Sequence, residues 1–485
     1  MALSVSACVA LLALCLGAGL AGCAVNQATG ERHLDLIGKQ GEIAMGQQAD
    51  TQIVASLGVV PSADLQRYAQ DLGTKLAETS ERPELPWTFR VIDDPTVNAF
   101  AVPGGFIYVT RGLMTYVDNE AQLAGIVGHE IGHVTAQHSV HRMSADQLTQ
   151  VGVMAGMILI PELQKFGGLV DAGLGLLYLK FSRDDETQAD QLGLRYMVKA
   201  GQDPRQLIEV FDMLARVGQT AGSGRLPEWL ATHPNPENRS QRIQTELDTF
   251  TTNLSALSVH RNDYLSLIDG MVFGPNPREG FFRAQHFYQP EMEFEYEFPS
   301  GWQTANMRDA VAAVSRDQDA IVQITLAQGV SGLKAAQQFF GQEGLQSESL
   351  EHKTQNGLQT YSAGFRAQTE DGVLRGRASF VEYKGLTYRL LGYTTEPLWS
   401  KYQSSLGGSM GTFRQLTDPQ ILQVQPLHLK ILTVTAPSTL AALAQQHASP
   451  VPLSTLAIIN QIEETASVKT GDRIKMVMGV QLAVR

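Results

Sequence analysis

Two histidines four residues apart, with a glutamate beside the first, carry the strongest chemical signal in this sequence. The segment reads His129-Glu130-Ile131-Gly132-His133. On a helix, residues i and i+4 share one face, so both imidazoles can reach one metal ion. Zinc suits neutral imidazole nitrogen, and Glu130 can act as general base on a zinc-bound water and then pass the proton to a leaving amine. We therefore expect one Zn2+ per chain, held by His129 and His133.

A catalytic zinc needs a third protein ligand. The metzincin pattern requires Gly at 136 and His at 139, but the chain has Ala136 and Ser139, which excludes that class. Glu186 and Asp190 lie four apart in a downstream segment of helical pattern. We expect Glu186 to bind zinc and Asp190 to accept the second N–H of a ligand imidazole, that of His129. The competing interpretation is a pair of solvated carboxylates in the first turn of a helix, where acids are common.

The helix that must present the two histidines has a recognisable start. Asn119 is a suitable N-cap, and Gln122 follows three residues later, as in a capping box. His138 and His141 follow the motif, and we expect them beside the site or at the surface rather than among the ligands. Apolar residues keep helical spacing on one side of this helix: Leu123, Ile126, Val127 and Val134.

Other helical patterns surround this segment, at 41–57, 63–78, 185–200, 205–217 and 239–250. A strand is predicted at 87–92 and a hairpin or bent strand pair at 98–110. The apolar run 151–160 is too short to span a membrane and ends before Pro161, so it is predicted to be a buried helix. Residues 24–260 are therefore expected to form a mainly helical domain with a small sheet.

The second half of the chain has a different character. After a predicted linker at 261–289, residues 290–415 contain several β-rich runs and one helical run, 333–340, which predicts an α+β domain of unassigned role. Residues 426–485 follow the order strand, helix, helix, strand, which resembles a LysM module, the small fold that binds peptidoglycan sugars. The overall expectation is an α+β fold class.

The first 23 residues resemble the signal peptide of a bacterial lipoprotein. An apolar run at 9–16 is followed by Leu20-Ala21-Gly22-Cys23, which is similar to a lipobox, although no Lys or Arg precedes the run. Lipid on Cys23 would anchor the mature chain, and Ala24 after it implies the outer membrane, on its periplasmic side. The competing interpretation is a buried or membrane-inserted helix.

Composition excludes several classes of site and partner. The three cysteines, Cys8, Cys15 and Cys23, all precede the mature chain or begin it, so neither an internal disulfide nor a cysteine-rich metal site is expected. The net charge of −12 argues against nucleic acid as a partner.

Taken together, the motifs resemble the gluzincin peptidases of the HtpX and Oma type, and most closely their soluble periplasmic, BepA-like branch. The resemblance covers residues 30–250, about half of the chain, and departs from that branch downstream, where we find no tetratricopeptide repeats. The matching segments, in chain order, are Asn98 to Gly105, Asn119 to His138, Ser182 to Asp190, and Thr232-His233-Pro234 with Arg239.

The resemblance implies a zincin-type catalytic domain and a zinc-dependent endopeptidase that cuts unfolded or misassembled envelope proteins. It implies that 98–109 forms an edge strand, beginning at Asn98, Ala99 and Phe100, which could pair an extended substrate. It also implies that His233 lies near the metal, where it would stabilise the oxyanion or occupy the open position as a brake. Arg239 would help to hold the oxyanion or that loop.

Two other functions stay open at this stage. One is a chaperone that keeps zinc only structurally, in which case replacing Glu130 would change nothing. The other is a cell-wall binding lipoprotein whose main function lies in the LysM-like segment, with peptidoglycan as its partner.

Overall fold

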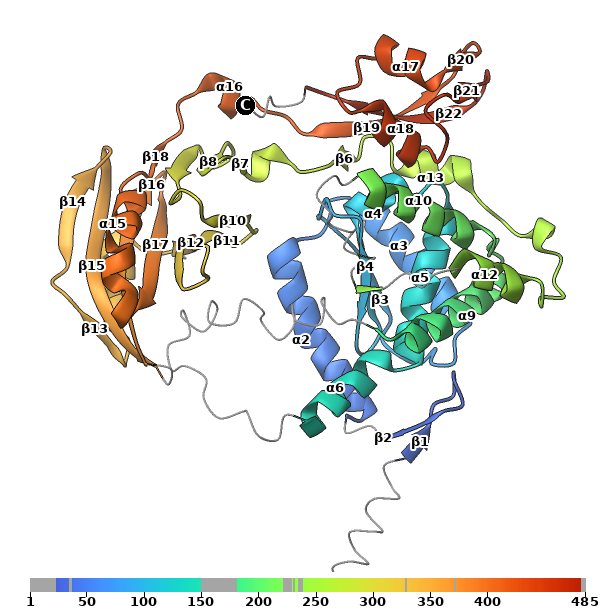
Figure 1. The fold of residues 1–485 in the computed structure, drawn as a ribbon, viewed down its shortest axis with the longest axis horizontal. Coiled ribbons are helices and arrows are strands. Elements are labelled where there is room, and N and C mark those ends of the chain that lie inside the picture. Colours follow the sequence, from blue (N-terminus) through green and yellow to red (C-terminus); the bar gives the residue numbers. More distant parts are fainter. Residues whose placement is uncertain are drawn as a thin grey trace, which may run out of the picture.

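The computed structural model describes residues 23–34, 37–149, 181–220, 229, 232–233, 239–327, 329–369 and 372–480 (Figure 1). The apolar run of the expected signal peptide and the expected buried helix at 151–160 lie outside the described residues. Helices and strands are mixed throughout, which confirms the α+β class. Among the described residues, no helix combines the length and the apolar character needed to cross a membrane.

The first part of the chain is a helical domain with a three-stranded sheet. α5 runs through its centre and is buried along almost its whole length. The helices are α2 (Lys39–Leu57), α3 (Ala63–Ala77), α4 (Arg111–Tyr116), α5 (Glu120–Thr135), α6 (His138–Thr149), α9 (Arg183–Lys199), α10 (Gln206–Thr220) and α12 (Arg239–Leu247), with the short helix η2 (Leu254–Ala256). A hairpin of β1 (Cys23–Val25) and β2 (Arg32–Leu34) precedes them.

The sheet of this domain has the order β3 (Thr88–Ile92), β5 (Phe106–Thr110), β4 (Ala99–Val102). The expectation of one edge strand over 98–109 is therefore wrong in part. Only β4 lies at the edge, because the chain reverses at Gly104 and Gly105 and β5 pairs on both sides. Both glycines have positive φ, and a Cβ on Gly104 would lie 2.8 Å from the Cα of Ile43.

α5 begins as the sequence predicts, with one difference in detail. The Asn119 side chain accepts a hydrogen bond from the Gln122 backbone N–H at 2.9 Å. The Gln122 side chain reaches back to the N–H of Asp118, at 2.8 Å, rather than to that of Asn119. Two of the donors that a helix start leaves unpaired are still satisfied.

Residues 261–289 are not the expected linker. α13 (Arg261–Leu267) buries Tyr264 and Leu265 in the core of the helical domain. β6 (Val272–Phe273) then joins the sheet of the C-terminal segment. The remaining elements of this stretch are η3 (Pro277–Glu279), β7 (Phe281–Arg283) and β8 (His286–Gln289).

The C-terminal segment packs on the helical domain, at the end where α4, α10 and α13 lie (Figure 1). Its sheet has the order β22-β19-β6, and its strand–helix–helix–strand order is the one expected from the sequence. Its elements are β19 (Leu427–Thr433), β20 (Ser438–Thr439), α17 (Leu440–Gln446), α18 (Leu453–Ile459), β21 (Ser467–Val468) and β22 (Arg473–Met478).

One buried lysine joins this segment to the helical domain. Lys475 has no exposed surface, and its ammonium donates to the carbonyl oxygens of Val117 at 2.5 Å and Ile459 at 2.7 Å. Longer bonds of 3.3 and 3.4 Å reach the carbonyls of Thr115 and Tyr116. Thr115 and Tyr116 end α4 and Val117 follows them, shortly before α5, whereas Ile459 ends α18, so the C-terminal segment is part of the scaffold that holds α5.

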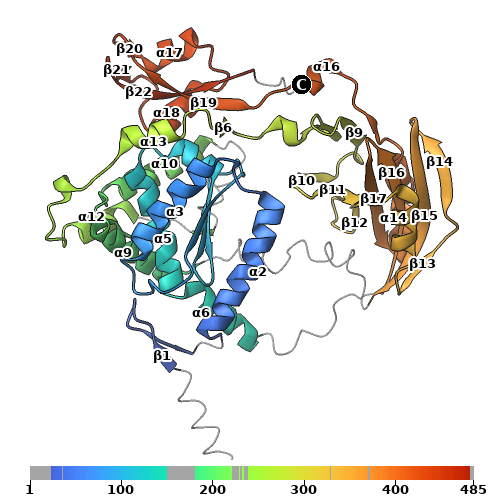
Figure 2. The same ribbon diagram turned by 180° about the vertical axis from the view of Figure 1, so that it is seen from behind.

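The domain of residues 290–415 is an antiparallel sheet with one helix on each face. Strands β15 and β16, joined by the longest ladder, lie beside β17 and β12. α14 packs on one core and α15 on the other. In both views α2 stands between this domain and the rest of the helical domain (Figures 1 and 2).

Among the elements of this domain that the sequence analysis did not predict are β16 and α15. The elements are β9 (Phe294–Glu297), β10 (Gln303–Asn306), β11 (Ala310–Val314), β12 (Ala320–Ala327), α14 (Gly332–Phe340), β13 (Leu345–Ser347), β14 (Glu351–Gln355), β15 (Leu358–Thr369), β16 (Gly372–Tyr383), β17 (Leu386–Thr395), η4 (Glu396–Leu398), α15 (Trp399–Met410), β18 (Arg414–Gln415) and α16 (Pro419–Leu422).

Candidate active site

α5 brings the two histidines of the motif to one point. The Nε2 atoms of His129 and His133 face each other at 3.0 Å, and both residues are at most 2% exposed. Two ligands of one tetrahedral zinc ion, each about 2.05 Å from it, would stand ~3.3 Å apart. The imidazole pair therefore has the spacing that one metal ion requires.

Glu186, on α9, completes a three-ligand set. Its carboxylate oxygens lie 3.6 Å from His129 Nε2 and 3.5 Å from His133 Nε2. α9 begins at Ser182 in a capping box with Asp185, so its first turn is fixed at the site. Glu186 is fully buried rather than solvated, so the acidic first turn of α9 faces the imidazole pair and could supply a metal ligand.

Glycines allow α9 to approach α5 this closely. A Cβ on Gly132 would lie 2.9 Å from the carbonyl oxygen of Ala189, and a Cβ on Gly193 would lie 2.9 Å from the backbone nitrogen of His129. Real Cβ atoms do not come so near to backbone atoms without a shift. The short distance between the helices is what lets Glu186 reach the two imidazoles.

His233 enters the same cluster from a separate segment. Its Nδ1 is 2.9 Å from Glu186 Oε1 and 3.3 Å from His129 Nε2. The indole of Trp229 stacks on its ring at 4.9 Å, which fixes the ring at the metal side. Ligand atoms of four buried residues, His129, His133, Glu186 and His233, lie within 4.8 Å of one another.

Glu130 lies beside the cluster but outside it. Its Oε1 is 3.5 Å from His233 Nε2 and accepts a bond of 3.4 Å from the Trp229 indole N–H. Its Oε2 is buried and has no hydrogen-bond partner among the described residues. An unpartnered buried carboxylate oxygen is costly, and a reacting water beside the metal would be its natural partner. The donor set and this oxygen together fit a catalytic metal site.

Two further residues, Asp190 and Arg239, contact the candidate ligands His129 and Glu186. Asp190 Oδ1 is 2.9 Å from His129 Nδ1, so the carboxylate accepts the N–H of that imidazole and leaves Nε2 free for the metal. Arg239 donates to both oxygens of Asp190, at 2.5 and 2.7 Å, and its Nη1 is 3.2 Å from Glu186 Oε2. Arg239 also lies over the Phe211 ring at 4.1 Å. Of the two expected roles, at the oxyanion or at the His233 loop, these contacts show neither: the guanidinium pairs with the two carboxylates.

His138 has a contact that the sequence did not assign. Its Nδ1 is 2.8 Å from His133 Nδ1, and its Nε2 is 3.1 Å from Gln188 Oε1. The neighbouring ring of Phe181 stacks on His133 at 3.9 Å. His138 therefore contacts the Nδ1 atom of His133, just as Asp190 contacts the Nδ1 atom of His129. A third histidine, five residues after His133, was the only available signal.

The charges around the cluster shift several pKa values. Burial would raise the pKa of Glu186, but His233 and His133 outweigh it and hold the pKa below its ordinary value. Burial would likewise raise that of Asp190, and Arg239 and His129 reverse this. Burial lowers the pKa of His133 well below its ordinary value. Ionised carboxylates and a neutral imidazole are the forms that bind a metal ion.

The segment that carries Trp229 and His233 contacts the chain just before the edge strand β4. The backbone N–H of Trp229 donates to the Val97 carbonyl at 3.4 Å, immediately before β4. Asn98, Ala99 and Phe100 are all buried, and the Phe100 ring stacks on Tyr108 at 4.9 Å. These side chains therefore build the sheet, and an incoming chain would meet the backbone edge of β4.

Comparison with known proteins agrees with this geometry. Residues 63–247 match the model of peptidase family M48. The beta-barrel assembly-enhancing protease of Yersinia pestis is 31% identical over 232 residues, 46% of this chain and 47% of that protein. That of Escherichia coli (strain K12) is 32% identical over 207 residues, covering 41% and 42%. The mitochondrial metalloendopeptidase OMA1 of Arabidopsis thaliana is 35% identical over 168 residues, covering 34% and 33%. The matches thus span about half the length of these curated relatives at most.

Proposed function

We propose that this chain is a zinc endopeptidase and that residues 63–247, which match the model of peptidase family M48, form its catalytic domain. The observation that carries the proposal is the convergence of His129, His133 and Glu186 on one point, with Glu130 beside it. Two imidazoles and one carboxylate are a ligand set typical of catalytic zinc, which keeps a further position open.

Zinc bound there would polarise the scissile carbonyl and acidify an attacking water. Glu130 takes the proton from that water and delivers it to the leaving amine. The Oε2 oxygen of Glu130, which has no partner among the described residues, is the atom available for this transfer. Asp190 keeps His129 in the tautomer whose Nε2 lacks a proton.

His233 acts as a brake in the conformation described here. It occupies the remaining place in the ligand cluster, which supports the brake over the alternative role at the oxyanion. The cluster and Glu130 are at most 2% exposed, so a polypeptide cannot reach them. Displacement of the segment that carries Trp229 and His233 would open the site and free the edge next to β4.

The substrates proposed are unfolded or misassembled envelope proteins. An extended chain can pair with the edge of β4, since main-chain hydrogen bonds require no particular side chains. The relatives named beta-barrel assembly-enhancing protease favour substrates of the bacterial envelope.

We place the protein in the periplasm, anchored to the outer membrane by lipid on Cys23. Three residues after Cys23, the Asn26 amide donates to the Thr135 carbonyl at 3.1 Å, at the end of α5. A lipid on Cys23 would therefore hold the active-site helix close to the membrane.

Cleavage of an unfolded protein tests the proposal. The full chain, supplied with zinc, should cut reduced and unfolded casein, and a chelator or Glu130→Gln should abolish cleavage. Glu130→Gln should still bind one zinc ion, measured by metal analysis, whereas Glu209→Gln on the exposed side of α10 should cut normally. Equal behaviour of the wild-type chain and Glu130→Gln would instead establish a chaperone that keeps zinc only structurally.

A second function, binding of peptidoglycan, is favoured by the order of elements in residues 427–478, in which β19 and β22 pair around two helices. Co-sedimentation of the full chain with purified sacculi tests it. Binding that oligomers of N-acetylglucosamine compete away would support the LysM prediction, and absence of co-sedimentation would refute it.

A further inference from the structure

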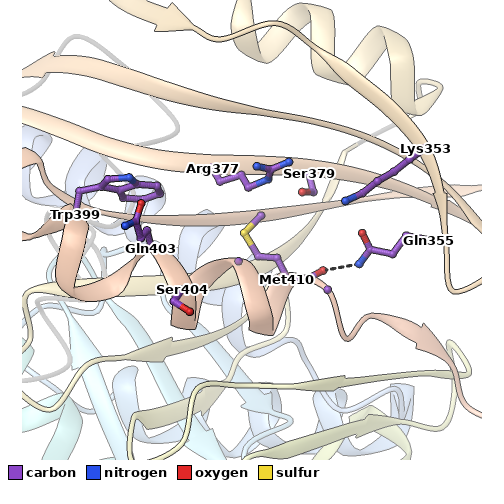
Figure 3. A pocket seen from close by; sticks show the side chains of 10 residues that line it. Lys353, Gln355, Arg377, Ser379, Trp399, Gln403, Ser404 and Met410 are labelled. Carbon is purple, nitrogen blue, oxygen red and sulfur yellow. Dashed lines mark hydrogen bonds between the residues drawn. The ribbon is translucent and has the colours of Figure 1, made fainter.

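A pocket of about 540 Å³ lies in the domain of residues 290–415, between α15 and the strands β14 and β16 (Figure 3). α15 packs Tyr402, Leu406 and Met410 on the sheet. A helix is about 10 Å wide and strands are about 4.8 Å apart, so one helix covers about two strands. The face of the sheet beside α15 is therefore left open, and the pocket occupies this space.

The pocket carries two cations that lack a full set of partners. Lys353 is exposed, and among the described residues no acceptor lies within hydrogen-bond distance of its ammonium. Arg377 donates through Nη2 to Glu351 at 2.9 Å and to Ser362 at 3.1 Å. Its Nε and Nη1 have no acceptor in the described part of the chain. None of the lining residues is acidic, although the chain as a whole carries a net charge of −12. The pocket thus favours an anion.

The wall formed by α15 has a gap where a side chain would stand. Trp399, Gln403 and Gly407 follow one another at intervals of four and line the pocket. A Cβ on Gly407 would meet nothing within 4 Å. Glycine is among the least favourable residues inside a helix, and here no close packing requires it. Gly408 is equally unobstructed, but only Gly407 lines the pocket, so a side chain at 407 would narrow it.

The other lining groups can recognise a peptide unit. The amides of Gln355 and Gln403 and the hydroxyl of Ser404 each offer both donors and acceptors. In Figure 3 the Gln355 amide points to the Met410 carbonyl, to which it donates at 3.4 Å, and Trp399 stands at the opposite end. The Trp399 ring and the Met410 side chain supply apolar surface at the helix wall.

We propose that this pocket binds the C-terminal end of a peptide chain whose last side chain is apolar. Lys353 and Arg377 pair with the terminal carboxylate, the glutamine amides contact the last peptide units, Met410 contacts the last side chain, and Trp399, at the other end of α15, contacts a residue further from the end of the peptide. Among the described residues β14 pairs only with β15, so its other edge is free to pair with an extended backbone, while its residues Lys353 and Gln355 line the pocket. This free edge favours a peptide over an acidic sugar, which has no strand-like backbone.

The test is calorimetric titration with the blocked peptide acetyl-Ala-Ala-Leu-Phe, with a free carboxylate or amidated. The full chain carries Glu130→Gln, so that the peptide stays intact and the result does not depend on whether the chain hydrolyses peptides. The carboxylate form should bind with a dissociation constant below about 1 mM, and the amidated form at least tenfold more weakly. Gly407→Leu, which fills the gap, and Lys353→Gln should each weaken binding at least tenfold.

Two controls match these variants. Gly408→Leu adds the same side chain one position further along α15, on a residue that does not line the pocket, and Lys334→Gln removes an exposed lysine on α14. Both should bind like the parent. Equal binding of the two peptide forms, or equal binding by Gly407→Leu and Gly408→Leu, would overturn the proposal. The proposal would also be overturned if glucuronic acid bound to the parent while the peptide did not, and if Gly407→Leu abolished the binding of glucuronic acid. Lys353→Gln alters an exposed side chain and decides the matter even if Gly407→Leu does not fold.

Discussion

His129 Nδ1 lies 2.9 Å from Asp190 Oδ1, and Arg239 donates hydrogen bonds to both oxygens of the same carboxylate. This relationship fixes which nitrogen of His129 faces the metal. It also links α5, α9 and α12 through one buried network, so the ligand geometry depends on three helices rather than on the motif alone.

Asp190→Asn should therefore lower zinc affinity by about 10- to 100-fold. The amide can present its NH2 group to the imidazole and so favours the wrong tautomer, and it leaves the Arg239 charge poorly paired. Competition with a chromogenic chelator measures the affinity. Asp184→Asn, an exposed position on the same helix, is the matched control and should bind zinc normally. Unchanged affinity in Asp190→Asn would show that the tautomer of His129 is set by another contact.

His233→Ala should raise the rate of casein cleavage by about tenfold or more, corresponding to about 1.4 kcal/mol of closing free energy removed. The reason is that His233 occupies the place that a reacting water and carbonyl need. Initial rates at saturating zinc provide the measurement, with His352→Ala in the distant sheet domain as control. A large loss of activity with intact zinc binding would mean that His233 acts at the oxyanion instead.

Gly132→Ala should weaken zinc binding at least about tenfold while α5 stays helical. The new methyl group would meet the Ala189 backbone at 2.9 Å and push α9 away, and with it Glu186. Alanine favours a helix over glycine by about 1 kcal/mol, so helix formation cannot account for a loss. Gly125→Ala on the same helix meets only the Leu207 and Met197 side chains, at 3.0 Å or more, and should bind zinc like the wild type. Equal affinities of the two variants would refute the close-approach argument.

Lys475 should give the protein a specific pH dependence of stability. Burial lowers the pKa of Lys475 from 10.5 to about 8, against the opposing effect of Asp118. Between pH 8 and 10.5 the unfolded chain therefore holds a proton that the folded chain has lost, and the free energy of unfolding should rise with pH across this window. At about 1.4 kcal/mol per unit, the rise amounts to about 3 kcal/mol.

Denaturant titration at a series of pH values checks this. In Lys475→Met the rise should disappear, and at pH 7 the variant should be less stable by about 1–3 kcal/mol, since the carbonyls of Val117 and Ile459 lose their donor. Lys469→Met, at an exposed position, should behave like the wild type. A pH profile that is identical in all three proteins would contradict the assignment.

Local pattern was sufficient for the centre of the fold. The capping residue Asn119 and the spacing of the apolar residues place α5, and the i, i+4 rule places His129 and His133 together on it. β16 and α15 were missed for a physical reason. β16 is buried on both faces over much of its length, so its residues do not alternate cleanly, and α15 begins with neither a capping side chain nor a strongly apolar stripe.

Arg239 shows how sequence alone leaves the role of a residue open. A buried arginine near a metal site could face either a reacting oxygen or the ligands, and only its bonds to Asp190 and its contact with Glu186 distinguish these. The stretch 261–289 is a similar case. It resembles a linker in sequence, yet Tyr264 and Phe273 of β6 are both buried in the core that the helical domain shares with the C-terminal segment, because burial there is supplied by partners distant in the chain.

By itself, the sequence indicated the metal-binding helix, the candidate ligands and the class of chemistry. His129 and His133 follow from residue type and spacing within one helix, and Glu186 follows from the acidic pair in a downstream helical pattern. Only the tertiary structure decided that His233 fills the cluster, that Arg239 supports rather than reacts, and that Lys475 docks the C-terminal segment beside α5. Those contacts join segments more than forty residues apart, and local periodicity carries no information about which distant groups meet once the core closes.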